Sequence, residues 1–224
     1  MASERAARLR GLYAITPGLA DTGVLCDRVA RAVAGGASLV QYRAKGIDRG
    51  LALEQARRVG ALCRAAGALF IVNDSIELAF ESGADGVHVG REDVGVAEAR
   101  RAMPRAIVGA SCYDDPKRAE TAAREGADYV AIGSVFASGT KPGAPRAPLE
   151  AIARASRISG LPVAAIGGID LHNARLACDA GADMLAVISA VFDAPDVAAA
   201  ARAIAALYDQ TTRTSDARTQ PRAV

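Results

Sequence analysis

Short apolar runs recur along the chain, and a longer amphipathic stretch rich in Ala and Arg separates each run from the next. A short run bounded by glycine or polar residues is typical of a buried strand, whereas apolar positions three and four apart are typical of a helix that covers a sheet. The pattern predicts strands at residues 12–15, 39–43, 69–73, 86–89, 107–111, 129–133, 163–166 and 184–188.

A Gly-Ala phrase followed by Ser or Asp comes directly before four of these runs, as a helix end that leads into a strand would. Its copies are Gly36-Ala37-Ser38, Gly83-Ala84-Asp85, Gly126-Ala127-Asp128 and Gly181-Ala182-Asp183. Strict alternation of strands and helices implies parallel strands, and eight such units in about 200 residues predict a (β/α)8 TIM barrel, of the α/β class. An open doubly wound sheet is the alternative, but no GxGxxG follows the first predicted strand.

The expected organisation is one catalytic barrel at residues 11–208, preceded by a leader segment at 1–10. The tail at 209–224 is polar, with too few apolar residues to pack, and we expect it to be disordered. No apolar run approaches the roughly 20 residues that a membrane-spanning helix needs, so we expect no transmembrane segment.

Composition narrows the classes of partner. Apolar residues make up 51% of the chain and charged residues 23%, which excludes an intrinsically disordered protein. The net charge of +2 gives no electrostatic reason to expect nucleic acid or a membrane surface as a partner, so any anion site must be local. The four cysteines show no CxxC or Cys/His spacing, which favours reduced thiols in a cytoplasmic protein over a zinc site or disulfides.

In a (β/α)8 barrel the chemistry lies at the carboxyl ends of the strands, where this sequence places many polar residues. Gln41, Arg43 and Lys45 follow one another at every second position, so all three should point toward the barrel mouth. They form a cationic row suited to an anionic substrate. The alternative is a solvated strand end whose charges pair with neighbours.

Two carboxylates and an amide occupy the ends of the next two predicted strands. Asn73 and Asp74 end one strand, and Asp93 follows the other closely. Mg²⁺ binds through one or two carboxylates while it keeps waters and phosphate oxygens, so Asp74 and Asp93 suffice for a site. Asp74 could instead cap the helix that follows. His88 is as compatible with a buried hydrogen-bonded role as with a functional one.

The long segment at 134–143 carries hydroxyls, glycines and Lys141, which is the composition of an anion clamp, although a plain surface loop is the alternative. Gly167-Gly168 and Ile188-Ser189 follow the last two predicted strands, whose loops bind phosphate in many barrels. Together these features predict two phosphorylated groups, one of them a diphosphate held by cations.

The ordered series LYAITP, VQYRAKG, IVND, GADGVHVGREDV, GASCY, GADYVAIGSVFASGTK, LPVAAIGGI and AVISAV resembles the thiamine-phosphate synthase family, from Leu12 to about Tyr208. The resemblance implies a Mg²⁺-dependent transferase that condenses hydroxymethylpyrimidine diphosphate with hydroxyethylthiazole phosphate, or a carboxylated thiazole phosphate, and releases pyrophosphate. It also implies a dissociative substitution in which the diphosphate departs before the thiazole nitrogen attacks. Small-molecule substrates are the expected partners, and the assembly state, including a homo-oligomer, is left open.

The resemblance also implies a role for each matching residue. It assigns the pyrimidine diphosphate to Gln41, Arg43, Lys45, Asn73, Ser111 and Lys141, of which Arg43, Lys45, Ser111 and Lys141 are the catalytic residues. It assigns the thiazole phosphate to Ser138, Gly139, Thr140, Gly168, Ile188 and Ser189, and Mg²⁺ to Asp74 and Asp93.

The sequence departs from the family pattern at two places. The family usually has Gln where Arg91 stands, and Pro-Thr where Ala137-Ser138 stands. Two other functions remain open. A thiazole tautomerase would share the barrel and phosphate cradle but needs a positioned acid or base, expected as a His after the fifth strand, where Ser111-Cys112-Tyr113 stands. A non-catalytic barrel that only binds a phosphorylated thiazole would not need Arg43 or the Asp pair.

Overall fold

The strands form a closed ring. The computed structural model describes residues 7–90, 95–137 and 145–218, and within them eight parallel strands pair in sequence order, with the last strand closing onto the first. The strands are β1 (Gly11–Ile15), β2 (Ala37–Tyr42), β3 (Leu69–Asn73), β4 (Gly86–Val89), β5 (Ile107–Tyr113), β6 (Tyr129–Gly133), β7 (Val163–Ile166) and β8 (Met184–Val187). The predicted (β/α)8 barrel is therefore confirmed.

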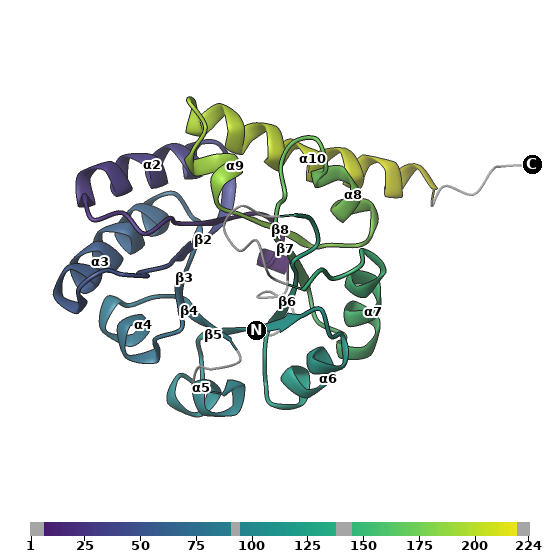
Figure 1. Cartoon of the computed structure of the whole chain (residues 1–224), viewed down its shortest axis with the longest axis horizontal. Helices are drawn as coiled ribbons and strands as arrows, with labels where there is room; N and C mark the ends of the chain where they lie inside the picture. The colour runs from purple at the N-terminus through teal and green to yellow at the C-terminus, as the bar shows by residue number, and fades with distance from the viewer. Residues whose placement is uncertain (1–6, 91–94, 138–144, 219–224) are drawn as a thin grey trace, which may run out of the picture.

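Helices enclose the ring on its outside (Figure 1). They are α2 (Thr22–Ala34), α3 (Arg49–Ala65), α4 (Ile76–Ser82), α5 (Val96–Ala102), α6 (Lys117–Arg124), α7 (Glu150–Ser159), α8 (Ala174–Asp179), α9 (Ser189–Phe192) and α10 (Val197–Arg218). The long helix α10 packs against α2 and α8, and so joins the first and last parts of the barrel wall.

The two faces of each strand have different surroundings because successive side chains point to opposite faces. Leu39 of β2 and Ile71 of β3 belong to the core inside the barrel. Val40 and Val72, the next residues along, belong to the core between the strands and the helices. Both cores are apolar, which explains why the strands appear in the sequence as nearly continuous apolar runs.

Leu9 closes the inside of the barrel at the amino ends of the strands. It precedes β1, is 1% exposed and packs with the interior core. Part of the predicted leader segment thus contributes to the barrel.

The repeated Gly-Ala-Asp phrases tie neighbouring strands together at the same end. In each copy the Asp carboxylate accepts a hydrogen bond, 2.8 Å long, from a backbone N–H at the start of the preceding odd-numbered strand. The Asp N–H donates in return to the carbonyl of that strand residue. The pairs are Asp85 with Phe70, Asp128 with Val108, and Asp183 with Val163.

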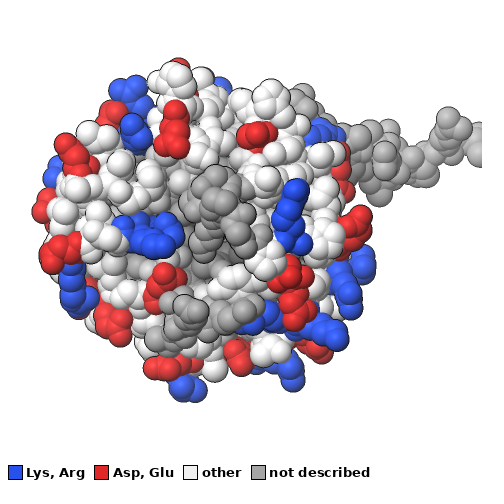
Figure 2. All heavy atoms as spheres, in the orientation of Figure 1, with Lys and Arg blue, Asp and Glu red and all other residues white. Residues whose placement is uncertain are grey.

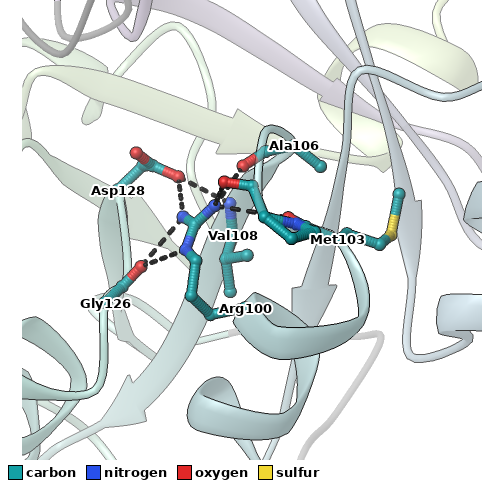
Figure 3. Close-up of polar contacts among 7 residues, drawn as sticks. Arg100, Met103, Ala106, Val108, Gly126 and Asp128 are labelled. Atoms are coloured by element: carbon teal, nitrogen blue, oxygen red, sulfur yellow. Dashed lines mark hydrogen bonds and ion pairs between the residues drawn. The ribbon is translucent and has the colours of Figure 1, made fainter.

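Arg100, at the end of α5, strengthens one of these connections (Figure 3). Its guanidinium pairs with Asp128 and donates to the carbonyls of Gly126, at 2.9 Å, and Ala106, at 2.7 Å. These acceptors flank the starts of β5 and β6. Arg100 therefore crosslinks a helix to two strands at the end of the barrel opposite the predicted mouth.

The structure differs from the sequence predictions at several element ends. Strand β2 ends at Tyr42 rather than Arg43, and β5 continues to Tyr113. The sequence analysis ends the barrel at residue 208, and α10 continues to Arg218. Extending an existing helix adds a hydrogen bond for each residue without a new nucleation step, so a polar continuation needs no burial of its own.

No helix in the described ranges is long and apolar enough to cross a bilayer. On the face shown in Figure 2, acidic and basic side chains are intermixed, in keeping with the net charge of +2.

Candidate active site

A cavity of about 1230 Å³ opens at the carboxyl ends of the strands. Its lining includes the ends of β2 to β8, together with Tyr13 and Ile15 of β1. Parallel strands in a closed ring bring these ends to one mouth, so residues that are distant in sequence face one space.

All of the predicted site residues that fall in the described ranges line this cavity. They are Gln41, Arg43, Lys45, Asn73, Asp74, Ser111, Gly168, Ile188 and Ser189. The remaining predicted residues lie outside the described ranges. They are Asp93, Ser138, Gly139, Thr140 and Lys141, and Arg91 is outside as well.

The basic side of the cavity follows β2. Gln41 is buried near the end of the strand, Arg43 is half-buried just beyond it, and Lys45 is exposed. The Arg43 backbone N–H donates to Thr16 Oγ1 at 3.0 Å, which holds the start of this loop against the end of β1. Thus two cations lie on a fixed turn at the mouth, where they can attract an anionic substrate.

Asp74 lies on the neighbouring side, directly after β3. Its φ of 66° is in the left-handed region, which Asp tolerates better than most residues, and its N–H donates to the carbonyl of His88 at 2.8 Å. Ser75 caps α4 by accepting from Leu78 N–H at 3.1 Å. The capping role considered for Asp74 is therefore wrong, because the next residue fills it.

The donor set on this side consists of oxygen atoms. Asp74, Asn73 and Ser75 line the same part of the cavity and offer carboxylate, amide and hydroxyl oxygens, which suit Mg²⁺ rather than Zn²⁺. Within the described ranges, no group of three or more His, Cys, Asp or Glu side chains could hold a metal ion.

The third side is built from the loops after β6, β7 and β8. Backbone N–H groups of Val135 and Phe136 donate to the carbonyls of Ile166 and Gly167, each at 3.0 Å. Gly168 has a φ of 61°, and a Cβ there would overlap the carbonyl of Ala137. Glycine thus permits a close approach of two loops beside Ser189, which begins α9.

A chain of hydrogen bonds crosses the floor of the cavity. Gln41 Nε2 donates to Tyr13 Oη at 2.8 Å, and the hydroxyls of Tyr13 and Tyr129 are 2.7 Å apart. His88 Nδ1 is 2.9 Å from Tyr129 Oη, and His88 Nε2 is 2.9 Å from Ser111 Oγ. The chain therefore connects β2, β1, β6, β4 and β5 through the inside of the barrel.

Burial keeps the two tyrosines of this chain protonated. Desolvation raises the pKa of Tyr13 and of Tyr129 above the usual value, so each hydroxyl has one hydrogen to donate. The sequence analysis did not identify either tyrosine. The sequence did offer a reason to consider them, because both tyrosines belong to runs of apolar residues that form strands. A buried tyrosine hydroxyl usually requires a hydrogen-bond partner.

The fold and the cavity define a class of protein before any comparison is made. A (β/α)8 barrel whose mouth combines cations, an acidic side and glycine-containing loops after β7 is typical of an enzyme that acts on phosphorylated small molecules.

Comparisons with known proteins agree with this class. Residues 12–191 match the protein family described as thiamine monophosphate synthase. The chain is 55% identical over 203 residues to the thiamine-phosphate synthase of Aromatoleum aromaticum, which covers 90% of this chain and 98% of the relative. It is 52% identical over 202 residues to the same enzyme of Chromobacterium violaceum, covering 90% and 97%.

A solved structure agrees as well. The thiamine phosphate pyrophosphorylase from Pyrococcus furiosus superposes with a TM-score of 0.82 at 35% identity, over 91% of this chain and 97% of that one. The chain therefore belongs to the thiamine monophosphate synthase family, whose enzymes are transferases, and the resemblance found in the sequence is confirmed.

Proposed function

We propose that this protein condenses hydroxymethylpyrimidine diphosphate with hydroxyethylthiazole phosphate to give thiamine phosphate and pyrophosphate. One observation carries the proposal beyond family membership. The described residues assigned to the two substrates and the metal come from five different strand ends, and all of them line one cavity. A pair of substrates that must meet at bonding distance needs such a shared space.

The basic and acidic sides of the cavity suit the diphosphate. We assign Gln41, Arg43, Lys45, Asn73 and Ser111, with Lys141, to the pyrimidine diphosphate, and we assign Asp74 and Asp93 to Mg²⁺. When bound, Mg²⁺ would neutralise charge that develops on the departing diphosphate. Arg43 and Lys45 act on the same charge from the neighbouring side of the mouth, and preorganised charges of this kind stabilise a transition state without rearrangement.

The loops after β6 to β8 suit the second substrate. We assign Gly168, Ile188 and Ser189, with Ser138, Gly139 and Thr140, to the thiazole phosphate, because Gly168 allows close backbone approach and Ser189 offers a hydroxyl at the mouth. A carboxylated thiazole phosphate carries one further charge at the same place and is an alternative substrate.

The proposed reaction is a dissociative substitution that needs no protein nucleophile. The bond from the pyrimidine methylene to the diphosphate oxygen breaks first, with its electron pair leaving on the oxygen, and the thiazole nitrogen then supplies the pair for the new carbon–nitrogen bond. Cys112 on β5 agrees with this scheme, because it belongs to the core between the strands and the helices and burial raises the pKa of its thiol to about 12.

We also propose the cytoplasm as the location. The four cysteines are free, and three of them are buried, which suits a reducing compartment.

The test mixes the purified protein with both phosphorylated heterocycles, with and without Mg²⁺, and measures thiamine phosphate and pyrophosphate. Asp74→Asn should lower the Mg²⁺-dependent rate by roughly 10², because it removes one negative ligand while preserving shape. Asp27→Asn is the control, since that carboxylate pairs with Arg31 on the exposed face of α2.

Equal amounts of the two products with wild-type protein support the proposal. Proton exchange or isomerisation of a thiazole phosphate without pyrophosphate release would favour the tautomerase alternative. Binding of the thiazole phosphate without turnover would favour the non-catalytic barrel. If Asp74→Asn matched Asp27→Asn in rate and in Mg²⁺ requirement, the metal assignment would be wrong.

A further inference from the structure

The hydrogen-bond chain in the barrel floor has a direction, and it can be derived by counting donors. Tyr13 accepts from Gln41 Nε2, and among the described residues its only other hydrogen-bond partner is Tyr129. Tyr13 is 1% exposed, so its own hydrogen has to be donated to Tyr129 Oη. A reversed chain would require the Gln41 amide to turn its oxygen toward Tyr13, whereas in the structure Nε2 faces this hydroxyl.

The same count of donors sets the direction of the remaining hydrogen bonds, from Tyr129 to Ser111. Because Tyr129 Oη accepts from Tyr13, its hydrogen goes to His88 Nδ1, 2.9 Å away. His88 then carries its hydrogen on Nε2 and donates to Ser111 Oγ. The hydrogen of Ser111 is left to point away from His88, toward the cavity that Ser111 lines.

Packing holds the rings in this arrangement. The Tyr13 and Tyr129 rings meet edge to face with centroids 5.9 Å apart, and the His88 ring stacks on Tyr129 at 5.5 Å. Gly109 of β5 leaves the room that Tyr129 requires, because a Cβ at this glycine would overlap the tyrosine ring and hydroxyl. The packing thus fixes the positions of the three rings and keeps their polar atoms within hydrogen-bonding distance of one another.

We propose that Tyr13, Tyr129 and His88 are positioning residues that fix the hydrogen-bonding polarity of the cavity floor. They leave Gln41 Oε1 as an acceptor at the end of β2 and the Ser111 hydroxyl as a donor at the end of β5. A planar heterocycle seated there must donate toward β2 and accept toward β5, as an aminopyrimidine can. An analogue with an oxo group in place of the amino group presents an acceptor to an acceptor and is rejected.

This inference rests on the proposed function for its substrate, but its direction can be measured without turnover. The protein contains only two histidines, His88 and His172, so ¹⁵N-labelled histidine gives a simple NMR spectrum. The His172→Gln variant identifies which signals belong to His88. We expect the spectrum of the wild-type protein to place a hydrogen of His88 on Nε2 and none on Nδ1. Tyr129→Phe should remove the donor to Nδ1 and shift the Nδ1 resonance. A hydrogen on Nδ1 in the wild-type protein would overturn the proposal.

The second measurement compares substrates. Tyr13→Phe removes the acceptor that orients the Gln41 amide, so we expect KM for the pyrimidine diphosphate to rise about tenfold with a smaller change in kcat, and discrimination against the oxo analogue to fall by a similar factor. Tyr42→Phe is the matched control, since Tyr42 is an equally buried tyrosine of β2 whose hydroxyl donates to Gln55 at 2.7 Å outside the barrel.

The outcomes distinguish a failure of the proposed function from a failure of the proposed positioning role. A wild-type protein that forms no thiamine phosphate contradicts the proposed function, whereas the NMR result still tests the direction of the chain. An active wild-type protein with Tyr13→Phe indistinguishable from Tyr42→Phe contradicts the positioning role. If Tyr13→Phe does not fold, Tyr129→Phe provides the same comparison of KM and discrimination.

Discussion

Asp183 is a half-buried carboxylate at the amino end of β8, and its chemistry links pH to stability. Burial raises its pKa above the usual 3.8, while the hydrogen bond from Val163 and the charge of Arg10 oppose the rise. A raised pKa in the folded state means that the contribution of Asp183 to stability is full below its unfolded pKa. That contribution is lost as the pH rises through the folded pKa.

We therefore expect Asp183→Asn to gain stability relative to wild type as the pH rises from about 4 toward neutrality, because the amide oxygen still accepts from Val163 N–H but cannot become charged. Urea unfolding across this pH range measures the difference. Asp183→Ala is the control: it cannot become charged either but loses the acceptor, so it should be about 1–3 kcal/mol less stable than Asp183→Asn at every pH. A difference between wild type and Asp183→Asn that did not change with pH would contradict the coupling.

At the scale of elements, Arg100 shows how a helix is fixed to two strands. Its side chain is 24% exposed, that of Asp128 is 22% exposed, and the guanidinium also serves the carbonyls of Gly126 and Ala106. This differs from the exposed pairs on the helices, such as Arg58 with Glu54, which are largely solvated.

Arg100→Met should lower the free energy of unfolding by about 2–3 kcal/mol, because it leaves a partly buried carboxylate unpaired and two carbonyls without their donor. Arg58→Met should change it by less than about 0.5 kcal/mol. Thermal or urea unfolding distinguishes the two. Steady-state rates should be preserved in both variants, since Arg100 lies at the opposite end of the barrel from the cavity. A catalytic defect in the folded Arg100→Met protein would contradict this separation.

At the scale of the whole molecule, the barrel divides its two ends between stability and chemistry. The amino end holds the Gly-Ala-Asp connections, Arg100 and the plug residue Leu9, while the carboxyl end holds the cavity. Residues at the amino end of such a barrel can be optimised for packing without constraint from the substrate.

Leu9→Ala tests this division. The substitution should open a void inside the barrel and cost about 2–5 kcal/mol, with KM for both substrates unchanged. Leu176→Ala, at a leucine that is 52% exposed, should change stability by less than about 0.5 kcal/mol. Calorimetry together with kinetics provides both readouts. A stable Leu9→Ala protein would mean that the segment before β1 does not close the barrel.

The sequence by itself determined the barrel and much of its mouth. Eight apolar runs alternating with amphipathic stretches predict the strand order, because a parallel strand buried on both faces requires continuous apolar residues. The polar residues at strand ends, such as Arg43 and Asp74, were identifiable because a closed ring brings all carboxyl ends to one face. Local pattern alone sufficed for these inferences.

Only the tertiary structure decided which groups share hydrogen bonds across the barrel. Tyr13 and Tyr129 are 116 positions apart, and their runs resemble ordinary core strands until the ring closes and places the two hydroxyls in contact. The capping of α4 by Ser75 rather than Asp74, and the continuation of α10 beyond residue 208, depend on backbone geometry and on helix propagation. The proposed direction of the floor network depends on the same closure, because it rests on the donors and acceptors that the closed ring brings together.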